Sequence, residues 1–194
     1  MNPGPISYAE FGEHFMREVV TAQRLQSEIQ ALLTASIEGE VHKLPADLLK
    51  ASYRANLHRV EVTQDRSPAG LSTFRVGLQG TLGLAIKVVS IPLKFSVKLT
   101  VAIDMTAYTY APCLIRLLPS PVPPQGVVID VDPHGIPEDL LDKLNIIQPA
   151  VHEEIVSEVN RRIGSPEIIA ATTIDVAALA RNASLSLPPT AAAV

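Results

Sequence analysis

The sequence predicts an α+β fold in which long antiparallel strands are covered by two long helices. Apolar residues recur at spacings of three and four over residues 8–35 and again over 149–163, as in amphipathic helices. Between them, residues 50–65, 71–89 and 91–108 alternate between apolar and polar, which is typical of strands with one buried face. Strands and helices do not alternate along the chain, so we expect the helices to lie on one face of an antiparallel sheet.

Composition bounds the class of protein. We expect the 194 residues to form a single domain over residues 1–185, followed by a disordered Ala- and Pro-rich tail at 186–194. Hydrophobic residues make up 47% of the chain but aromatic residues only 4%, which predicts an aliphatic core. The net charge is −4 and the basic residues are scattered, so a nucleic-acid partner is not expected. No window contains the roughly 18 uninterrupted apolar residues that a membrane-spanning helix needs.

The first helix is predicted to run unbroken from Tyr8 to Ala35. Ser7 and Glu10 have the spacing of a capping box, in which the two residues satisfy backbone N–H groups at the helix start. A helix of this length would span ~42 Å at 1.5 Å per residue. Its apolar stripe comprises Phe11, Phe15, Val19, Ala22, Leu25, Ile29 and Leu32.

The strands follow, with a candidate short strand between the first helix and Pro45. In the next strand the apolar parity changes at His58 and Arg59, which predicts a β-bulge there. The segment 66–70 is predicted to be a turn, and glycines interrupt the strand at 71–89 where it curves or another backbone approaches closely. In the stretch 91–108, every odd position up to 105 is apolar, so we expect these side chains to point inward.

The C-terminal third is predicted to contain a short strand at Val127–Val131 and then a turn with a short helix. A second long helix is predicted to begin near Pro149, a residue that suits the first turn of a helix, and to end at Gly164. One more short strand or helix is expected after it.

No motif for catalysis or metal binding is recognisable, so we expect no catalytic residue, metal or cofactor. His152 lacks the second histidine four residues later that a helical zinc motif requires. Cys113 is the only cysteine, which excludes an intramolecular disulfide, and its apolar surroundings predict a buried side chain. One acidic turn contains Asp130, Asp132, His134, Glu138 and Asp139, and its spacing matches no known cation-binding loop. An enzyme that uses His134 with these carboxylates is a further hypothesis.

The long aliphatic faces allow two interpretations. Either the side chains of helix and sheet fill the space between them, or an elongated hydrophobic ligand occupies it, which stabilises an acyl chain by about 0.8 kcal/mol per buried methylene. The candidate ligand-binding residues follow from the periodicity: Phe11, Phe15, Leu25 and Ile29 on the first helix, Phe95, Val97, Leu99, Val101 and Ile103 on the long strand, and Val151 and Ile155 on the second helix.

The order of long helix, long strands and long helix over residues 7–165 resembles the tubular lipid-binding (TULIP) superfamily, and within it the small bacterial and bactericidal/permeability-increasing-protein-like domains. The resemblance implies a long, highly twisted antiparallel sheet wrapped around the N-terminal helix, with acyl chains lying between them. It also implies non-enzymatic binding or transport of a lipid or another hydrophobic small molecule. Bacterial members are often exported, whereas the start of this sequence has no visible signal peptide and predicts a cytoplasmic location unless a leader was removed.

An alternative from another class is a protein-interaction module with a filled core. Such a module would bind a partner or itself through an apolar groove or a strand edge. A transient membrane contact and a homodimer are both left open by the sequence.

Overall fold

The computed structural model describes residues 4–33, 36–41, 49–66, 71–88, 91–131 and 138–182. They form an α+β fold, as predicted, with these elements: α1 (Tyr8–Val19), α2 (Ala22–Leu32), β1 (Ile37–Val41), β2 (Leu49–Arg66), β3 (Ser72–Val88), β4 (Ile91–Tyr110), β5 (Leu114–Pro119), the 3-10 helix η1 (Pro124–Gly126), β6 (Val127–Asp130), α3 (Glu138–Ile163), α4 (Pro166–Ala171), β7 (Thr173–Asp175) and α5 (Val176–Asn182). The predicted turn at 66–70 and tail at 186–194 lie wholly or largely outside the described residues.

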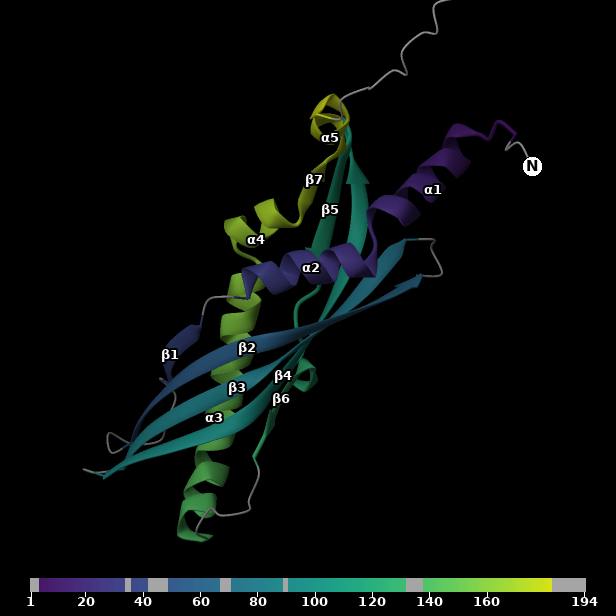
Figure 1. Cartoon of the computed structure of the whole chain (residues 1–194). Helices are drawn as coiled ribbons and strands as arrows, with labels where there is room; N and C mark the ends of the chain where they lie inside the picture. The colour runs from purple at the N-terminus through teal and green to yellow at the C-terminus, as the bar shows by residue number, and fades with distance from the viewer. Residues whose placement is uncertain are drawn as a thin grey trace, which may run out of the picture.

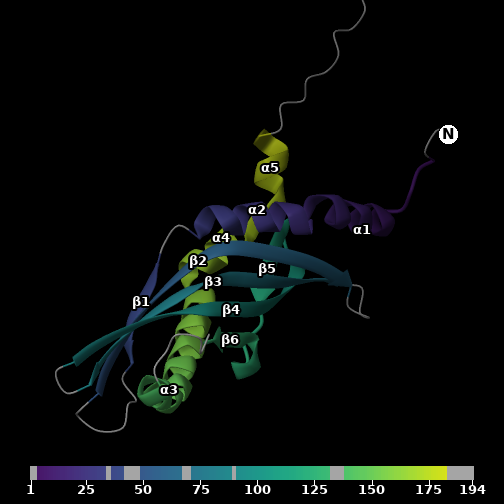
Figure 2. The ribbon, with the colours of Figure 1, turned by 60° about the horizontal axis from the view of Figure 1, so that its bottom comes forward.

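The strands form one antiparallel sheet that curls like half of a barrel (Figures 1 and 2). Its order is β1-β2-β3-β4-β5-β7, and β6 also pairs with β4. β5 and β6 pair with different stretches of β4, Met105–Tyr110 and Lys98–Val101 respectively. β4 therefore runs along the whole length of the sheet. On the side away from β3, it pairs with β5 near its C-terminal end and with β6 in its middle.

The predicted bulge is confirmed, because the register between β2 and β3 shifts between Leu57 and Arg59. Gly80 lies opposite the bulge, where a Cβ would collide with the carbonyl oxygen of Asn56. A glycine at this position allows the two backbones to approach closely while the strand bends.

The inward direction of the odd positions of β4 is also confirmed. Val97, Leu99, Val101, Ile103 and Met105 are each at most 7% exposed. The side chains of 91 and 93 are not described. The concave face of the sheet is thus aliphatic along most of its length.

The second long helix starts earlier than predicted. α3 runs from Glu138 to Ile163 and contains Pro149 in its interior, so the predicted start at Pro149 is wrong. A proline inside a helix removes one backbone hydrogen bond and costs about 3 kcal/mol. Here Ile147 and Val151, on either side of it, are each only 1% exposed, and their burial against the sheet offsets that cost.

The predicted unbroken N-terminal helix is wrong as well. It is divided at Val20 and Thr21, and Thr21 caps the second part by accepting a hydrogen bond from the backbone N–H of Arg24 at 3.3 Å. Figure 1 shows that α1 and α2 run in different directions. The predicted capping box is confirmed at the start of α1, where Ser7 and Glu10 satisfy each other's backbone N–H groups.

α2 lies along the edge of β2, beyond the stretch that β1 covers. Glutamine side chains connect the two: the Val62 N–H donates to Gln26 and Gln30 donates to the His58 carbonyl, both at 3.4 Å. The helix therefore covers an edge that would otherwise leave backbone groups unpaired. The long helix on the concave face is α3, which Figure 2 shows beneath the curl of the strands.

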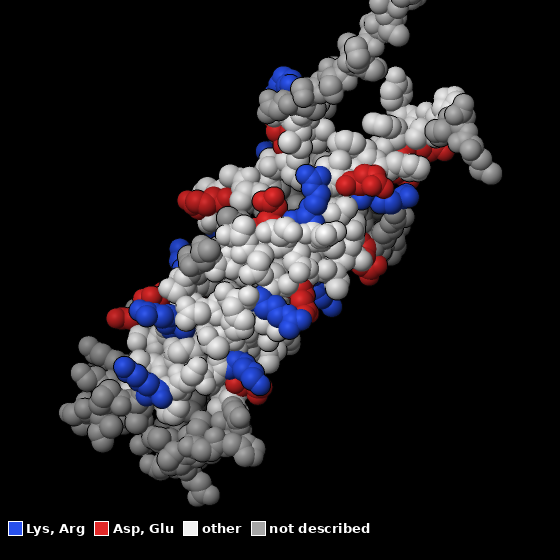
Figure 3. Space-filling view, in the orientation of Figure 1, with Lys and Arg blue, Asp and Glu red and all other residues white. Residues whose placement is uncertain are grey.

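Two further points concern the surface. Cys113 is exposed, contrary to prediction, because residues 111–113 form the turn between β4 and β5 rather than part of a strand. In the described part of the chain, no helix has the length and apolar character needed to cross a membrane. On the face drawn in Figure 3, basic and acidic side chains are interspersed.

Candidate functional site

A cavity of about 620 Å³ lies against one half of the concave face. Its volume falls within the roughly 300–1,000 Å³ that small-molecule sites occupy. The strands β1 to β5 contribute one wall: Ile37 of β1, Tyr53, Ala55 and Leu57 of β2, Val76 and Leu78 of β3, Leu99, Val101, Ile103 and Met105 of β4, and Leu117 and Pro119 of β5.

The opposite wall is built from short elements and helix ends. It comprises Leu25, Ile29 and Leu33 from α2 and its C-cap, Ile155, Val159 and Ile163 from α3, Ile168 and Ala171 from α4, Ile174 from β7, and Ala178 and Leu179 from α5. Two of these side chains, Ala171 and Ala178, are small, and the wall is divided among α2, α3, α4, β7 and α5 (Figure 1). The strand side chains that line the cavity therefore have no continuous layer of side chains packed against them.

Tyr53 bounds the cavity toward β1. Its side chain is 5% exposed, and a Cβ added at Gly39 would stand 2.5 Å from its hydroxyl oxygen, so the ring lies directly over that glycine. Burial raises the pKa of the Tyr53 hydroxyl, and the negative charges of Glu158 and Glu154 raise it further. The phenol thus stays neutral and forms one end of the cavity.

Charged side chains line only the rim of this cavity. Arg24 and Glu28 come from α2, Glu158 and Arg162 from the last turns of α3, and Asp175 from β7. The Asp175 carboxylate accepts a hydrogen bond from the Ala178 N–H at 2.8 Å, so it caps α5. Apart from the Tyr53 hydroxyl, the interior is largely aliphatic, and none of these five charged residues is fully buried.

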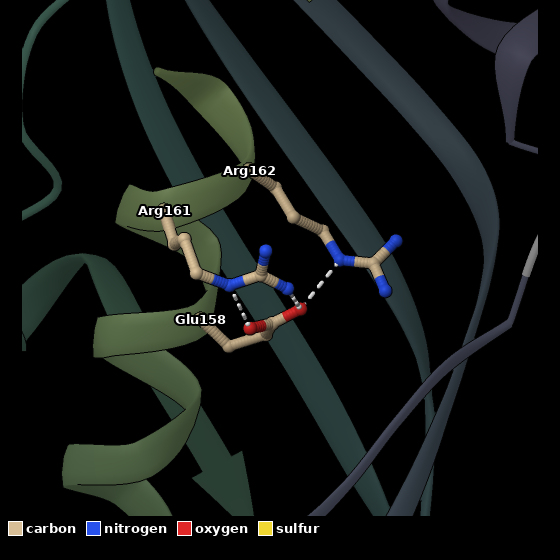
Figure 4. A network of polar contacts seen from close by, with 3 residues as sticks. All are labelled: Glu158, Arg161 and Arg162. Atoms are coloured by element: carbon tan, nitrogen blue, oxygen red, sulfur yellow. Dashed lines mark hydrogen bonds and ion pairs between the residues drawn. The ribbon is translucent and has the colours of Figure 1, made fainter. Parts of the chain in front are cut away.

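Glu158 is the centre of an ion-pair network at this rim (Figure 4). Arg161 donates to both of its oxygens, from Nε at 2.8 Å and from Nη2 at 2.7 Å, and the Nε of Arg162 donates to one of them at 2.7 Å. The Glu158 side chain is only 13% exposed. The hydrogen bond from Arg161 lowers the pKa of Glu158 more than burial raises it, so the carboxylate stays ionised.

Six of the eleven ligand-binding residues predicted from the sequence lie together around the cavity. Leu25, Ile29, Leu99, Val101, Ile103 and Ile155 line the cavity, whereas Phe11, Phe15, Phe95, Val97 and Val151 do not.

The five others lie elsewhere for identifiable reasons. Phe11 is 58% exposed on α1, where its ring stacks on that of Phe15 with centroids 6.1 Å apart. Val97 and Val151 are buried in the half of the sheet that α3 fills. Phe95 borders a separate depression on the sheet between charged residues of β1, β2 and β4.

Sequence reasoning missed the contributions of β2, β3, β5 and the segment 166–179. The alternation in β2 and β3 did identify their inward residues, but it gave no sign of which ones a helix would cover. The segment after α3 carries no long periodic pattern, so its role as a wall had no signal in the sequence.

Within the residues that the structure describes, no three His, Cys, Asp or Glu side chains are placed to hold a metal ion. His152 lies 2.9 Å from the Val127 carbonyl oxygen and so connects α3 to β6. The side chains of the candidate residues Asp132, His134, Glu138 and Asp139 lie outside the described part.

Comparison with known proteins adds no assignment. A scan of protein-family models and a search of curated proteins both found no match to this chain.

Proposed function

We propose that the protein is a non-enzymatic carrier of a hydrophobic ligand, a lipid whose acyl chain occupies the cavity between the sheet and the helices. The observation that carries this proposal is the cavity of about 620 Å³ with an aliphatic interior and charges only at its rim. A cavity lined by aliphatic side chains offers water few hydrogen bonds and favours an apolar occupant. Each methylene buried there contributes about 0.8 kcal/mol to binding.

Membership of the tubular lipid-binding superfamily is part of this proposal. The curled antiparallel sheet with helices supports it. The cavity covers half of the concave face, and the other half is filled by α3, so the acyl chain would lie at the end bounded by α2, α4 and α5.

The test is lipid retention and uptake. Native mass spectrometry and lipid extraction of the purified protein should reveal a bound lipid, and a fluorescent fatty acid should bind saturably. Ile29→Trp would fill the cavity from α2 and should reduce uptake at least about tenfold, the effect of losing roughly 1.4 kcal/mol of binding. Ser27→Trp introduces the same side chain at an exposed position of the same helix and should bind like the wild type. Absence of lipid together with no saturable uptake would refute the carrier function.

A second candidate function, self-association, is favoured by one observation on α1. None of the twelve side chains of this helix is buried, and Ile6, Tyr8 and Phe11 around its start are 51%, 97% and 58% exposed. These exposed apolar side chains would be covered if α1 packed against a second copy of the chain. Two copies related by a two-fold axis would bring the same apolar surface of each chain into contact.

Sedimentation at increasing protein concentration tests this second function. Wild-type protein should form a dimer, and Phe11→Ser should shift it to monomer. Ile169→Ser, which removes an exposed apolar side chain from α4, should leave the dimer unchanged. A monomer at all concentrations would rule out self-association through α1 without bearing on the lipid cavity.

A further inference from the structure

Arg162 presents an incompletely used guanidinium group at the rim of the cavity. Only its Nε atom bonds to Glu158, at 2.7 Å. Figure 4 shows its two terminal nitrogen atoms directed away from that carboxylate. Within the described part of the chain, no hydrogen bond or ion pair involves these two nitrogens. Four N–H donors therefore point away from the network beside an aliphatic cavity.

The network around Arg162 holds one unbalanced positive charge. Glu158 supplies one carboxylate for two guanidinium groups, and Arg161 already occupies both of its oxygens. The Arg162 side chain is 40% exposed, compared with 72% for Arg161, and only Arg162 lines the cavity. Glu158 thus fixes the orientation of Arg162 without neutralising the pair.

Three other charged residues at the rim, Arg24, Glu28 and Asp175, also affect how the cavity would bind an anion. Arg24 lines the cavity from α2 and donates through Nη1 to the Val19 carbonyl at 3.2 Å, but Glu28 lies one turn further along the same helix. Asp175 is already bonded to the N–H of Ala178. Arg162 is therefore the rim residue whose geometry most favours an anion, because its position is fixed and its donors are free.

We propose that the ligand is an amphiphile with an anionic head group, a carboxylate or a phosphate monoester, which binds the terminal nitrogens of Arg162 while its acyl chain lies in the cavity. This inference rests on the proposed lipid-carrier function. A guanidinium group matches two oxygens of a carboxylate or phosphate in a bidentate pair. The aliphatic wall beside it lowers the local dielectric constant and strengthens that pair.

The experiment compares matched ligands and matched variants. Binding of oleate is measured against oleyl alcohol, and oleoyl lysophosphatidic acid against monooleoylglycerol, so that each pair differs in head-group charge at one chain length. Arg162→Gln should weaken both anionic ligands by about tenfold or more, as expected for losing a charge-assisted bidentate pair. It should leave both neutral ligands within about twofold of wild type. Arg161→Gln removes the other partner of Glu158 and should leave all four affinities within about threefold.

The outcomes separate the two proposals. If the wild type binds none of the four ligands, the carrier function itself is wrong. If anionic and neutral ligands bind equally well, or if both arginine variants lose the same affinity, the carrier function stands and the role of Arg162 is overturned. A preferential loss of oleate in Arg162→Gln assigns a carboxylate head, and a preferential loss of lysophosphatidic acid assigns a phosphate; both support the inference.

Discussion

The two halves of the concave face have the same aliphatic character but different contents. In one half, Ile147 and Val151 of α3 and strand residues such as Leu82 and Val97 are buried in the hydrophobic core, and none of them lines the cavity. Over the other half, the same strands face α2, the C-terminal part of α3, α4 and α5, and a cavity of about 620 Å³ remains. The difference arises from what lies opposite the strands, because the alternation within β3 and β4 continues unchanged across both halves.

The contrast between the two halves identifies the part of the concave face that has room for a ligand. A long helix presents a continuous stripe that interlocks with strand side chains at close-packed density. Short helices and helix ends present a few side chains each, and two of them, Ala171 and Ala178, are small. The half covered by short elements is thus the half that can admit a ligand.

The largest effect is expected from Val101→Asp in the sheet wall of the cavity. Val101 is 1% exposed on β4 and lines the cavity with aliphatic neighbours. A carboxylate there would be buried without a hydrogen-bond partner, so we expect a loss of about 4 kcal/mol or more in the free energy of unfolding. Chemical denaturation measures it. Thr100→Asp, on the exposed face of the same strand, should cost less than about 1 kcal/mol; equal losses would contradict the assignment of the two faces.

A pair of truncations on β3 compares the two halves directly. Leu82 is fully buried in the filled half, whereas Leu78 faces the same way but lines the cavity. Leu82→Ala should cost about 3–4 kcal/mol, since it opens a new void in packed surroundings. Leu78→Ala should cost about 1–2 kcal/mol, because one side of that leucine already lacks packing partners.

Urea denaturation of both variants, with unchanged m-values, gives the comparison. Equal costs at the two positions would mean that the cavity is closed or filled in solution. Adding a bound fatty acid should increase the cost of Leu78→Ala, because the ligand supplies the missing contacts.

The sequence predicted the sheet well because its signals are local. Inward positions on β3 and β4 follow from alternation, the bulge at Leu57–Arg59 follows from a change of parity, and the cap at Ser7 follows from a four-residue motif. Each of these features depends on neighbours within a few residues or on one buried face.

The division into a filled and a hollow half could not be predicted in the same way. It depends on where α3 begins, and burial of Ile147 and Val151 carries that helix through Pro149 against local preference. It depends equally on the break at Thr21. The apolar stripe runs through this break without interruption, and Thr21 lacks the capping-box signature because the residue three positions later is Arg24 rather than an acidic residue. Both are decided by packing between segments distant in sequence.

A smaller effect distinguishes the two N-terminal helices. Thr21→Ala removes the cap of α2, which is packed along β2, and should cost about 1 kcal/mol of global stability. Ser7→Ala removes the cap of α1, which buries no side chain, so it should leave the unfolding transition within about 0.3 kcal/mol and reduce only the helical signal. Circular dichroism during denaturation reports both quantities. An equal loss of global stability would mean that α1 is packed in solution, as dimerisation would produce.

The smallest effect concerns the ion-pair network at the rim of the hollow half. The pKa of Glu158 is lowered in the folded protein, first by the hydrogen bond from Arg161, so its contribution to stability is present above the ordinary glutamate pKa of about 4.3 and is lost as the pH falls through the folded value. Glu158→Gln should therefore lower stability at pH 7 by no more than about 1 kcal/mol, since the side chains of Arg161 and Arg162 are 72% and 40% exposed, and it should converge with wild type as the pH falls through the lowered pKa of Glu158. Thermal unfolding between pH 3 and 7 measures the two curves. Glu28→Gln removes a carboxylate from the same rim without disturbing this network and is the control. If the wild-type and Glu158→Gln curves stay parallel throughout, Glu158 does not hold the arginines in the way that an oriented Arg162 requires.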